Sequence, residues 1–591
     1  MSAPRTEDRA ATYVRGLGEQ QAHLARLRRW TNVLVALRLA ALLLLTVLWY
    51  EACTTRTRSG IGPIAAGLLF IGLTIGIALL ESRARRHQAL VRYYHEGLAR
   101  LEDRQVEGAP QGTCPADHPY AADLDILGPA SLFSLMCMAR TGTGQETLAR
   151  WLLNPTSPEQ LPDRQRAVAE LRDRLELRQE LWLAGGVVGG KGEQALETWL
   201  ASGLTPVSRA RRLGTALVGA LGLVVLLGLW DPRWFISVLL VFPLQRLYAR
   251  RYSSLTRTIS ASVYRRADEF RAIGRLAARL RHQQFTTSLL AHMVAQLADS
   301  GRHIRRLVVL VDWLESRRNP FFGVLAGALL VPEQLCLAIE CWRARHGQAA
   351  QRWLAAIGEA EALASLATFA FEHPDYPFPE VKSESAPAFV ATGLGHPLIP
   401  ARTRVVNDVQ LGPEGRLLVV TGSNMSGKST LLRTVGINAV LAQAGAPVCA
   451  ASLCMTPLHV GASLRAQDSL AEGVSRFFAE IQRLHSILSL AKQKRVLFLL
   501  DEILNGTNSQ DRREGAEAIV RQLLQRQAIG IVTTHDLALA HMDLAPPGIN
   551  VHFQDGLEGD RLVFDYRMRP GVVSRRNALA LMRLVGIEIP S

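Results

Sequence analysis

The chain has 591 residues, of which 48% are apolar and 20% charged, so it is long enough for several folded domains and is not disordered throughout. Lys and Arg number 67 against 52 Asp and Glu, and the formal charge of +15 favours anionic partners such as lipid headgroups, nucleotides or nucleic acid without choosing among them. The seven cysteines include no Cys-x-x-Cys pair, so neither a disulfide framework nor a zinc site is expected.

Two apolar runs follow a polar leader, residues 1–30, and predict a first transmembrane hairpin over residues 31–82. The run "IGPIAAGLLFIGLTIGIALL", residues 61–80, holds no charge and has the length that a helix needs to cross the hydrocarbon core of a bilayer. Residues 33–50 are equally apolar except for Arg38, which can snorkel toward the interface. A buried core helix is the alternative interpretation of either run.

A second pair of apolar runs predicts a second hairpin over residues 209–245. Its first run, residues 213–230, is long enough to span a membrane. Its second run, residues 234–244, is short and contains Pro243, so a re-entrant segment is the alternative to a full span. For this pair too, buried core helices remain an alternative interpretation.

Arginines flank both hairpins at their outer ends and are fewer in the short turns between the paired runs. Under the positive-inside rule, this asymmetry places the N-terminus, the middle and the C-terminus of the chain in the cytoplasm. We therefore expect a multi-pass protein of the cell membrane with four spans. The flanking residues are Arg26, Arg28, Arg29, Arg83, Arg85, Arg86, Arg209, Arg211, Arg212, Arg246, Arg250 and Arg251.

The regions on either side of the second hairpin, residues 83–208 and 246–372, show a helical pattern. Apolar residues recur there at three- and four-residue spacing, and Gly and Pro are few in the long helical stretches. Residues 321–340 form a further apolar stretch that is interrupted by Pro332 and Glu333. We expect a buried core helix in this stretch.

One predicted helix carries a row of arginines. In "RADEFRAIGRLAARL", Arg271, Arg275 and Arg279 lie four residues apart and share one helix face. Such a row can meet the phosphates of lipid or nucleic acid. An ordinary solvated face is the favoured interpretation, because charged rows on helices usually face water.

The Pro-rich segment "EHPDYPFPEVKSESAPAF" ends the helical region, and residues 373–591 are predicted to form an α/β domain. In this domain "RLLVVTG" predicts a buried parallel strand that leads into Gly422-x-x-x-x-Gly427-Lys428-Ser429 and then into a helix. The order of strand, glycine-rich loop and helix is the context of a phosphate-binding loop. A glycine-rich turn that arose by chance is the alternative.

The loop residues have separate roles in this interpretation. Backbone amides cradle the phosphates at a helix N-terminus, Lys428 brings a positive charge to the β- and γ-phosphates, and the Ser429 hydroxyl ligates magnesium. The expected cofactors are ATP and Mg²⁺. The predicted nucleotide-binding residues are Gly422, Ser423, Asn424, Met425, Ser426, Gly427, Lys428, Ser429 and Thr430.

Two further predicted strands end in polar residues. The strand "RVLFLLDE" ends with Asp501, placed to hold the magnesium shell, and Glu502, placed to take the proton from the attacking water. Two carboxylates at the end of an apolar strand are costly unless they bind something. The strand "AIGIVTTHD" presents His535, which suits a hydrogen bond to the γ-phosphate, although a lone histidine is ordinarily structural.

These motifs resemble those of the MutS mismatch-repair ATPases. The likeness runs from "DLDILGPASLF" through "TGSNMSGKST", "GVSRFFAEI", "LLDEILNGTNSQD" and "TTHD" to "PGVVSRRNALALMRLVGI". Ser423 stands where the family usually has Pro, and Ser426 where it usually has Gly. In the stretch Ser475-Arg-Phe477-x-x-Glu480, the resemblance implies that the serine reaches the nucleotide of the opposite subunit. It therefore implies a homodimer through the ATPase domains and adds Ser475 to Lys428, Glu502 and His535 as catalytic residues.

The resemblance also implies the fold and the function. We expect a multidomain chain with an α-helical core and lever region, two transmembrane helical hairpins and a C-terminal α/β P-loop NTPase domain of the MutS/ABC type. ATP hydrolysis would be coupled to conformational change, with double-stranded DNA as a candidate ligand. Because the polar leader is followed at once by apolar runs, we expect neither an N-terminal mismatch-recognition domain nor a Phe-x-Glu wedge that reads a mispaired base.

Two other functions stay open at this point. A membrane scaffold whose ATPase only switches its conformation would carry the same motifs without binding DNA. A transporter ATPase is disfavoured, because the region ahead of the second strand lacks a Leu-Ser-Gly-Gly-Gln signature and the apolar runs hold few polar residues for a substrate path. We expect no small-molecule substrate other than ATP.

Overall fold

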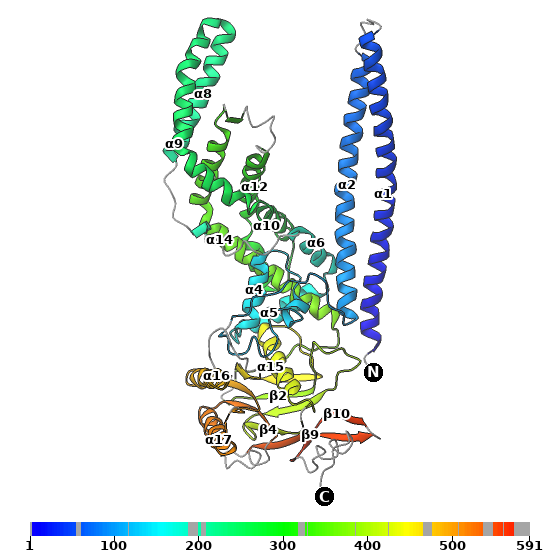
Figure 1. Ribbon diagram of the computed structural model, residues 1–591, viewed down its shortest axis with the longest axis vertical. Helices are drawn as coiled ribbons and strands as arrows, with labels where there is room; N and C mark the ends of the chain where they lie inside the picture. Colours follow the sequence, from blue (N-terminus) through cyan, green and yellow to red (C-terminus); the bar gives the residue numbers. More distant parts are fainter. Residues whose placement is uncertain are drawn as a thin grey trace. The chain divides into compact units, whose positions relative to one another are not determined.

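A computed structural model (Figure 1) gives the fold of the chain. It falls into two compact units, one within Met1–Ala109 and Phe371–Asp375 and the other within Pro110–Ala370 and Tyr376–Ser591. The residues that the structure describes are 3–54, 61–115, 117–186, 199–201, 208–316, 326–327, 329–383, 386–423, 425–464, 476–505, 507–535, 548–558 and 561–572.

The first unit contains two long helices, α1 (Ala3–Thr54) and α2 (Ile61–Leu101), which pack against each other as an antiparallel hairpin. Only 6% of the most apolar window of α1 and 11% of that of α2 is buried, so their apolar side chains face outward. At the end of the hairpin away from its turn, a glycine lets α1 and α2 pack closely. A Cβ atom on Gly97 of α2 would lie 2.5 Å from the ring of Tyr13 of α1. Both helices are long and apolar enough to cross a membrane.

A buried ion pair lies at the end of this hairpin that is opposite its turn. Arg100 Nη2 lies 2.7 Å from Oε1 of Glu372, and the two side chains are 5% and 2% exposed. The Arg100 Nε donates to both carboxylate oxygens, and the Tyr13 hydroxyl donates to Oε1 at 3.1 Å. Burial alone would lower the pKa of Arg100. The Glu372 carboxylate has the opposite and larger effect, so the pKa of Arg100 is raised overall. This pair fixes the end of helix α14 within the first unit.

The second unit has a helical part built around α14 (Val331–Glu372), whose last two residues belong to the first unit. The apolar window of α14 is 89% buried. In the predicted stretch, Cys336, Leu337 and Ile339 are buried, which confirms a core helix there from Val331 onward; residues 321–325 and 328 lie outside the described part. Pro332 lies in its first turn, where a missing N–H costs nothing, so it begins the helix rather than interrupting it. The other helices are α3 (Leu132–Met136), α4 (Gly142–Leu153), α5 (Leu161–Arg172), α6 (Leu175–Gly185), α10 (Ala267–Leu280), α11 (Ser288–Gln296) and α12 (Ser300–Ser316).

A second hairpin extends from this helical part. It consists of α8 (Ser208–Trp230), a short 3-10 helix η1 (Pro232–Ser237) and α9 (Val238–Tyr264). Only 17% of the apolar window of α8 is buried, and this helix meets the length and composition of a span. The predicted fourth span, residues 234–244, is divided between η1 and α9 and does not meet that criterion, because the apolar part of α9 soon gives way to arginines.

The predicted row of arginines on α10 is partly solvated, since Arg275 and Arg279 are exposed, but its members also contact neighbouring groups. Arg271 lies within ion-pair distance of three carboxylates, and the other two arginines contact α6. Side-chain hydrogen bonds from Glu315 and then Asp312 raise the pKa of Arg271 despite its partial burial. Arg271 is therefore neutralised by its neighbours, and the other two arginines link α10 to α6 while staying exposed. The contacts are Arg271 with Asp268, Asp312 and Glu315, Arg275 with the Ala184 carbonyl, and Arg279 with Glu180.

The C-terminal part is an α/β domain with two sheets, as expected from the sequence. Its main sheet has six strands in the order β10-β9-β4-β8-β7-β6, and only the β10–β9 pair is antiparallel. A smaller sheet has the order β1-β5-β2-β3. The strands are β1 (Glu380–Val381), β2 (Phe389–Leu394), β3 (Asn407–Leu411), β4 (Leu417–Thr421), β5 (Ser452–Met455), β6 (His459–Ser463), β7 (Val496–Asp501), β8 (Ile529–Thr534), β9 (Ile549–Glu558) and β10 (Arg561–Pro570). The helices are α15 (Lys428–Ala444), α16 (Arg476–Ala491) and α17 (Ser509–Gln525).

The main sheet brings the polar strand ends together. All five residues of β4 are buried, as are all six of β8, because helices cover both faces of a parallel sheet. Thr421 pairs with Thr534, and Asp501 pairs with Thr533. The residues that follow β4, β7 and β8 therefore lie at one edge of the sheet.

The buried pair in the first unit generates a stability prediction. Arg100→Met should destabilise the protein by about 3–5 kcal/mol, because Glu372 would stay buried without its counter-charge. Denaturant unfolding of the detergent-solubilised chain measures the change. Arg521→Met, which removes an exposed partner of Glu517, is the control and should cost less than about 1 kcal/mol. Equal effects of the two substitutions would contradict the role given to the buried pair.

Candidate active site

The loop between β4 and α15 has a backbone that requires glycine at two positions. Gly422 has φ +154° and Gly427 has φ +105°, a region that residues with a side chain rarely occupy. A Cβ atom on Gly422 would lie 3.0 Å from the Phe553 carbonyl oxygen, and one on Gly427 would lie 3.1 Å from the Tyr566 ring. The loop therefore runs close to β9 and β10. Asn424 lies outside the described residues.

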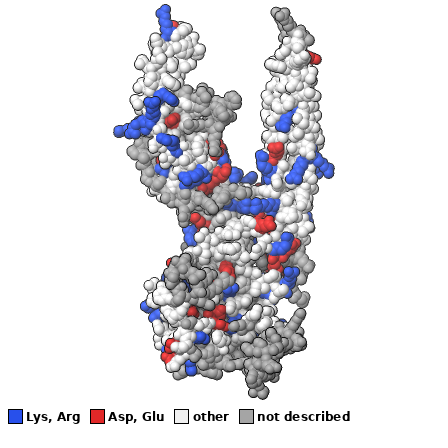
Figure 2. All heavy atoms as spheres, viewed as in Figure 1, with Lys and Arg blue, Asp and Glu red and all other residues white. Residues whose placement is uncertain are grey.

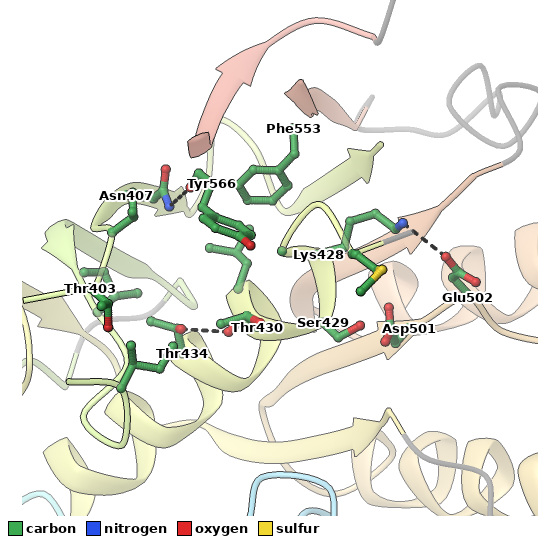
Figure 3. A pocket seen from close by; sticks show the side chains of 16 residues that line it. Thr403, Asn407, Lys428, Ser429, Thr430, Thr434, Asp501, Glu502, Phe553 and Tyr566 are labelled. Atoms are coloured by element: carbon green, nitrogen blue, oxygen red, sulfur yellow. Dashed lines mark hydrogen bonds and ion pairs between the residues drawn. The ribbon is translucent and has the colours of Figure 1, made fainter. Parts of the chain in front are cut away.

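Lys428 is held over this loop by oxygen atoms. Its Nζ donates to the carbonyl oxygens of Gly422 at 3.0 Å and Ser423 at 2.9 Å, and it lies 3.2 Å from Oε1 of Glu502. The side chain is only 5% exposed. Figure 3 shows Lys428 pointing toward Glu502. The structure thus brings together a lysine and a carboxylate that are 74 positions apart in the chain.

Thr533 fixes both predicted carboxylates. Its hydroxyl donates to Oδ1 of Asp501 and accepts a hydrogen bond from the backbone N–H of Glu502 at 3.1 Å. The Glu502 N–H also lies 3.2 Å from the Thr533 carbonyl oxygen. Glu502 has φ +45°, which is uncommon for a residue with a side chain and is typical of constrained functional positions. Thr533 was not among the predicted site residues, although it stands two positions before His535.

His535 and Glu480 lie on either side of this turn. His535 Nδ1 is 3.5 Å from Oε2 of Glu502, and its side chain is about half exposed, so it can also reach a ligand. Glu480 on α16 is 8% exposed and accepts a hydrogen bond from the Leu504 N–H at 2.7 Å. Leu504 also has a positive φ, of +59°. Glu480 therefore stabilises the turn after Glu502. Ser475 lies outside the described residues.

A pocket of about 640 Å³ opens beside the loop. Lys428, Ser429, Asp501 and Glu502 line its polar part. Figure 3 shows the rings of Phe553 and Tyr566 on the other side of Lys428 from Glu502. No sequence motif predicts this second part, because its residues come from separate loops and strands. They are Leu394, Ile399, Thr403, Val405, Asn407, Phe553 and Tyr566.

The pocket has the chemistry of a nucleoside triphosphate site. Glycine-rich backbone and Lys428 suit the phosphates, whereas the aromatic rings and aliphatic side chains suit a flat base. The buried hydroxyls of Ser423 and Ser426 have no hydrogen-bond partner among the described residues, and a phosphate oxygen can satisfy them.

Asn407 closes the apolar side of the pocket. Its Nδ2 donates to the Tyr566 carbonyl at 3.0 Å, and its Oδ1 accepts from the Met568 N–H at 2.7 Å. These two bonds tie β10 to β3 and so hold the Tyr566 ring at the pocket.

The residues present also fit Mg²⁺. Among the described residues no group of three or more His, Cys, Asp or Glu side chains forms a metal site. Mg²⁺ does not require one, since it commonly takes one or two protein oxygens and completes its shell with water and phosphate. Asp501 and Ser429 both line the pocket and can supply these oxygens.

Comparison with known proteins agrees with this geometry. Residues 418–590 match the family described as MutS domain V. The C-terminal domain of this chain is therefore similar to MutS domain V. This family region contains Gly422–Thr430, Ser475, Asp501, Glu502 and His535, so every predicted site residue lies within it.

Three relatives are similar to part of this chain. The DNA mismatch repair protein MutS 2 of Halobacterium salinarum is 35% identical over 260 residues, which are 42% of this chain and 29% of that protein. The Endonuclease MutS2 of Thermomicrobium roseum is 36% identical over 197 residues, 32% of this chain and 24% of the relative. The DNA mismatch repair protein MutS of Thermotoga neapolitana is 35% identical over 201 residues, 33% of this chain and 25% of the relative. The chain thus covers less than a third of the length of each relative.

The position of Thr533 generates a prediction about catalysis. Thr533→Val removes the donor to Asp501 at almost constant volume and should lower the ATPase rate by about 10- to 100-fold, as for other residues that orient a metal ligand. In the same variant, the Mg²⁺ concentration that gives half-maximal activity should rise. Thr533→Ser keeps the hydroxyl and should restore most of the activity. If the valine and serine variants behave alike, the hydroxyl has no positioning role.

Proposed function

We propose that this chain is a Mg²⁺-dependent ATPase of the MutS type, anchored in a membrane by its two helical hairpins, in which ATP binding and hydrolysis move the helical region. The observation that carries the ATPase proposal is the contact of Lys428 with Glu502 beside Asp501, in a pocket that also offers an apolar wall for a base. Hydrolysis needs these groups in one place, and the packing of β4, β7 and β8 supplies them.

Each residue has a role in the proposed hydrolysis. Lys428 balances the negative charge of the β- and γ-phosphates, and Asp501 with Ser429 holds the metal, which when bound neutralises phosphate charge. Glu502, which lines the pocket, accepts the proton of the attacking water. His535, which is near Oε2 of Glu502, donates a hydrogen bond to the γ-phosphate.

Substitution of Glu502 tests the role of the general base. Glu502→Gln should keep ATP binding and slow turnover by roughly two to four orders of magnitude. Lys428→Ala should instead weaken binding and turnover together, because the lysine contacts phosphates in both the ground state and the transition state. Steady-state turnover and nucleotide binding are measured on the same preparations, with Glu517→Gln on exposed α17 as the control. Normal turnover of the Glu502 variant would exclude this residue as the base.

We also propose a homodimer through the ATPase domains in which Ser475 acts on the nucleotide of the opposite subunit. The proposal rests on the MutS likeness of the stretch from Ser475 to Glu480. Ser475→Ala and Lys428→Ala chains should each be inactive alone. Mixed, they should recover part of the activity, because one of the two composite sites is then intact. Activity that stays absent in verified mixed dimers would show that each subunit hydrolyses ATP with its own residues.

Membrane anchoring is supported by the surfaces of the hairpins. The apolar windows of α1, α2 and α8 are 6%, 11% and 17% buried, so each would expose a sleeve of aliphatic side chains to water outside a bilayer. The flanking arginines place the N-terminus, the helical region and the ATPase domain in the cytoplasm. In this proposal the protein is a multi-pass protein of the cell membrane, and α9 with η1 completes the second hairpin.

Double-stranded DNA is the second candidate ligand, favoured by the names of two relatives as DNA mismatch repair proteins. The arginine row on α10 does not support this candidate, because Arg271 is already paired with carboxylates. ATPase rates of the solubilised protein with and without duplex DNA, at low and at physiological salt, decide between a DNA-coupled ATPase and an ATP-switched scaffold. A rate that duplex DNA changes supports the first, and an unchanged rate under both conditions supports the second.

A further inference from the structure

The base of the α8–α9 hairpin carries six arginines that the ATPase mechanism does not use. We call them the arginine collar. Five are exposed and Arg211 is half-buried, and none is ion-paired with a carboxylate within the described part of the chain. The arginine collar consists of Arg209, Arg211 and Arg212 on α8 and Arg246, Arg250 and Arg251 on α9.

Hydrogen bonds between the helices bring the two halves of the collar level with each other. The Tyr248 hydroxyl donates to the Ala210 carbonyl at 2.9 Å, and Gln245 Nε2 donates to the Leu217 carbonyl at 3.1 Å. The collar arginines flank Ala210 on α8 and Tyr248 on α9. Figure 2 shows basic residues gathered at this base, below a surface that is almost free of charge. We call this surface, which includes residues 213–230 of α8, the apolar sleeve.

The surroundings of the collar do not neutralise it. The Arg246 guanidinium lies 6.0 Å from the Phe242 ring centroid, and Arg251 lies 5.9 Å from that of Tyr252, so aromatic faces rather than carboxylates contact them. The six guanidinium groups stay charged at any physiological pH.

The sleeve above the collar matches a bilayer in length. Residues 213–230 of α8 extend about 27 Å at 1.5 Å per residue, close to the thickness of a hydrocarbon core. Trp230 and Trp234 lie at the turn of the hairpin and are 91% and 49% exposed, as is typical of aromatic residues at a membrane interface. From the turn to the base, the hairpin therefore presents an aromatic end, an apolar sleeve and a cationic collar.

We propose that the arginine collar binds the phosphate groups of anionic phospholipids in the leaflet that it faces. The proposal rests on the membrane anchoring proposed above and adds the class of lipid that this hairpin selects. Guanidinium groups bind phosphate oxygens in a bidentate manner. A nucleic acid would also satisfy the collar, but only a bilayer offers hydrocarbon to the sleeve and phosphate to the collar in the observed order. Each basic residue near an anionic surface strengthens its binding roughly fivefold.

The test compares lipids retained by the full-length protein. Purified protein is equilibrated in mixed micelles with equal amounts of phosphatidylglycerol and phosphatidylcholine, and bound lipid is counted by native mass spectrometry. The wild-type protein should be enriched in phosphatidylglycerol, and the Arg246→Gln, Arg250→Gln, Arg251→Gln variant should lose at least about two thirds of this enrichment. The three collar arginines that this variant keeps on α8, together with the arginines of the first hairpin, account for the remainder.

The matched control removes the same number of positive charges elsewhere. Arg166→Gln, Arg521→Gln and Arg569→Gln take away exposed arginines that are paired with Asp163, Glu517 and Asp565. This variant should keep the wild-type enrichment. Loss of enrichment in the control to the same degree would overturn the proposal, because net charge alone would then explain the preference.

Two further measurements separate the possible failures. Alkaline carbonate extraction of membranes tests anchoring. Release of the wild-type protein would disprove the membrane proposal itself, whereas a retained protein without lipid preference would disprove only the collar proposal.

Binding of a short duplex DNA is measured on the same variants. A collar variant that loses DNA binding but keeps its phosphatidylglycerol enrichment would assign the collar to nucleic acid and overturn the lipid proposal. Unchanged carbonate retention of the collar variant shows that it still folds and inserts.

Discussion

The register of β4, β8 and β7 is the constraint on which the candidate site depends. The three strands are parallel, so their carboxyl ends meet at one edge. The pairing of Asp501 with Thr533 fixes the position of the carboxylates along the strand direction, relative to the loop that follows Thr421. With a shift of one residue, side chains would point to the opposite face and Lys428 would lose Glu502. The apolar interior of these strands holds this register, because every residue of β4 and β8 is buried.

The parts of the site that follow one another in sequence could be predicted, and those that meet only through the sheet could not. The loop from Gly422 to Thr430 has a pattern whose backbone consequences are local, since glycine permits its positive φ values. The apolar wall with Phe553 and Tyr566 has no such pattern. These aromatic residues resemble ordinary core residues until the β10–β9 pair is placed beside the loop.

The same distinction applies to the helices. Hydropathy alone selects α1, α2, α8 and α14 as helices able to span a membrane. Burial separates them, because the apolar window of α14 is 89% buried and that of α1 is 6% buried. The arginine row on α10 is a second example: spacing placed the three residues on one face, but Asp312 and Glu315 of α12 pair with Arg271, and Glu180 of α6 lies near Arg279, which no local pattern indicates. Composition thus predicts the kind of surface, and only tertiary packing shows what that surface contacts.

Helix α14 makes polar contacts near both of its ends. Near its start, the Cys336 thiol donates to the Thr256 carbonyl of α9, and its last residue, Glu372, binds Arg100 of α2.

The chain continues from Glu372 to Tyr376 in four residues. The Tyr376 hydroxyl accepts a hydrogen bond from Arg404 at 2.6 Å, and the same guanidinium donates to the Ile399 carbonyl at 3.0 Å. Ile399 lines the pocket. The wall that would hold the base is therefore connected, through one arginine and four residues of chain, to the last residue of α14.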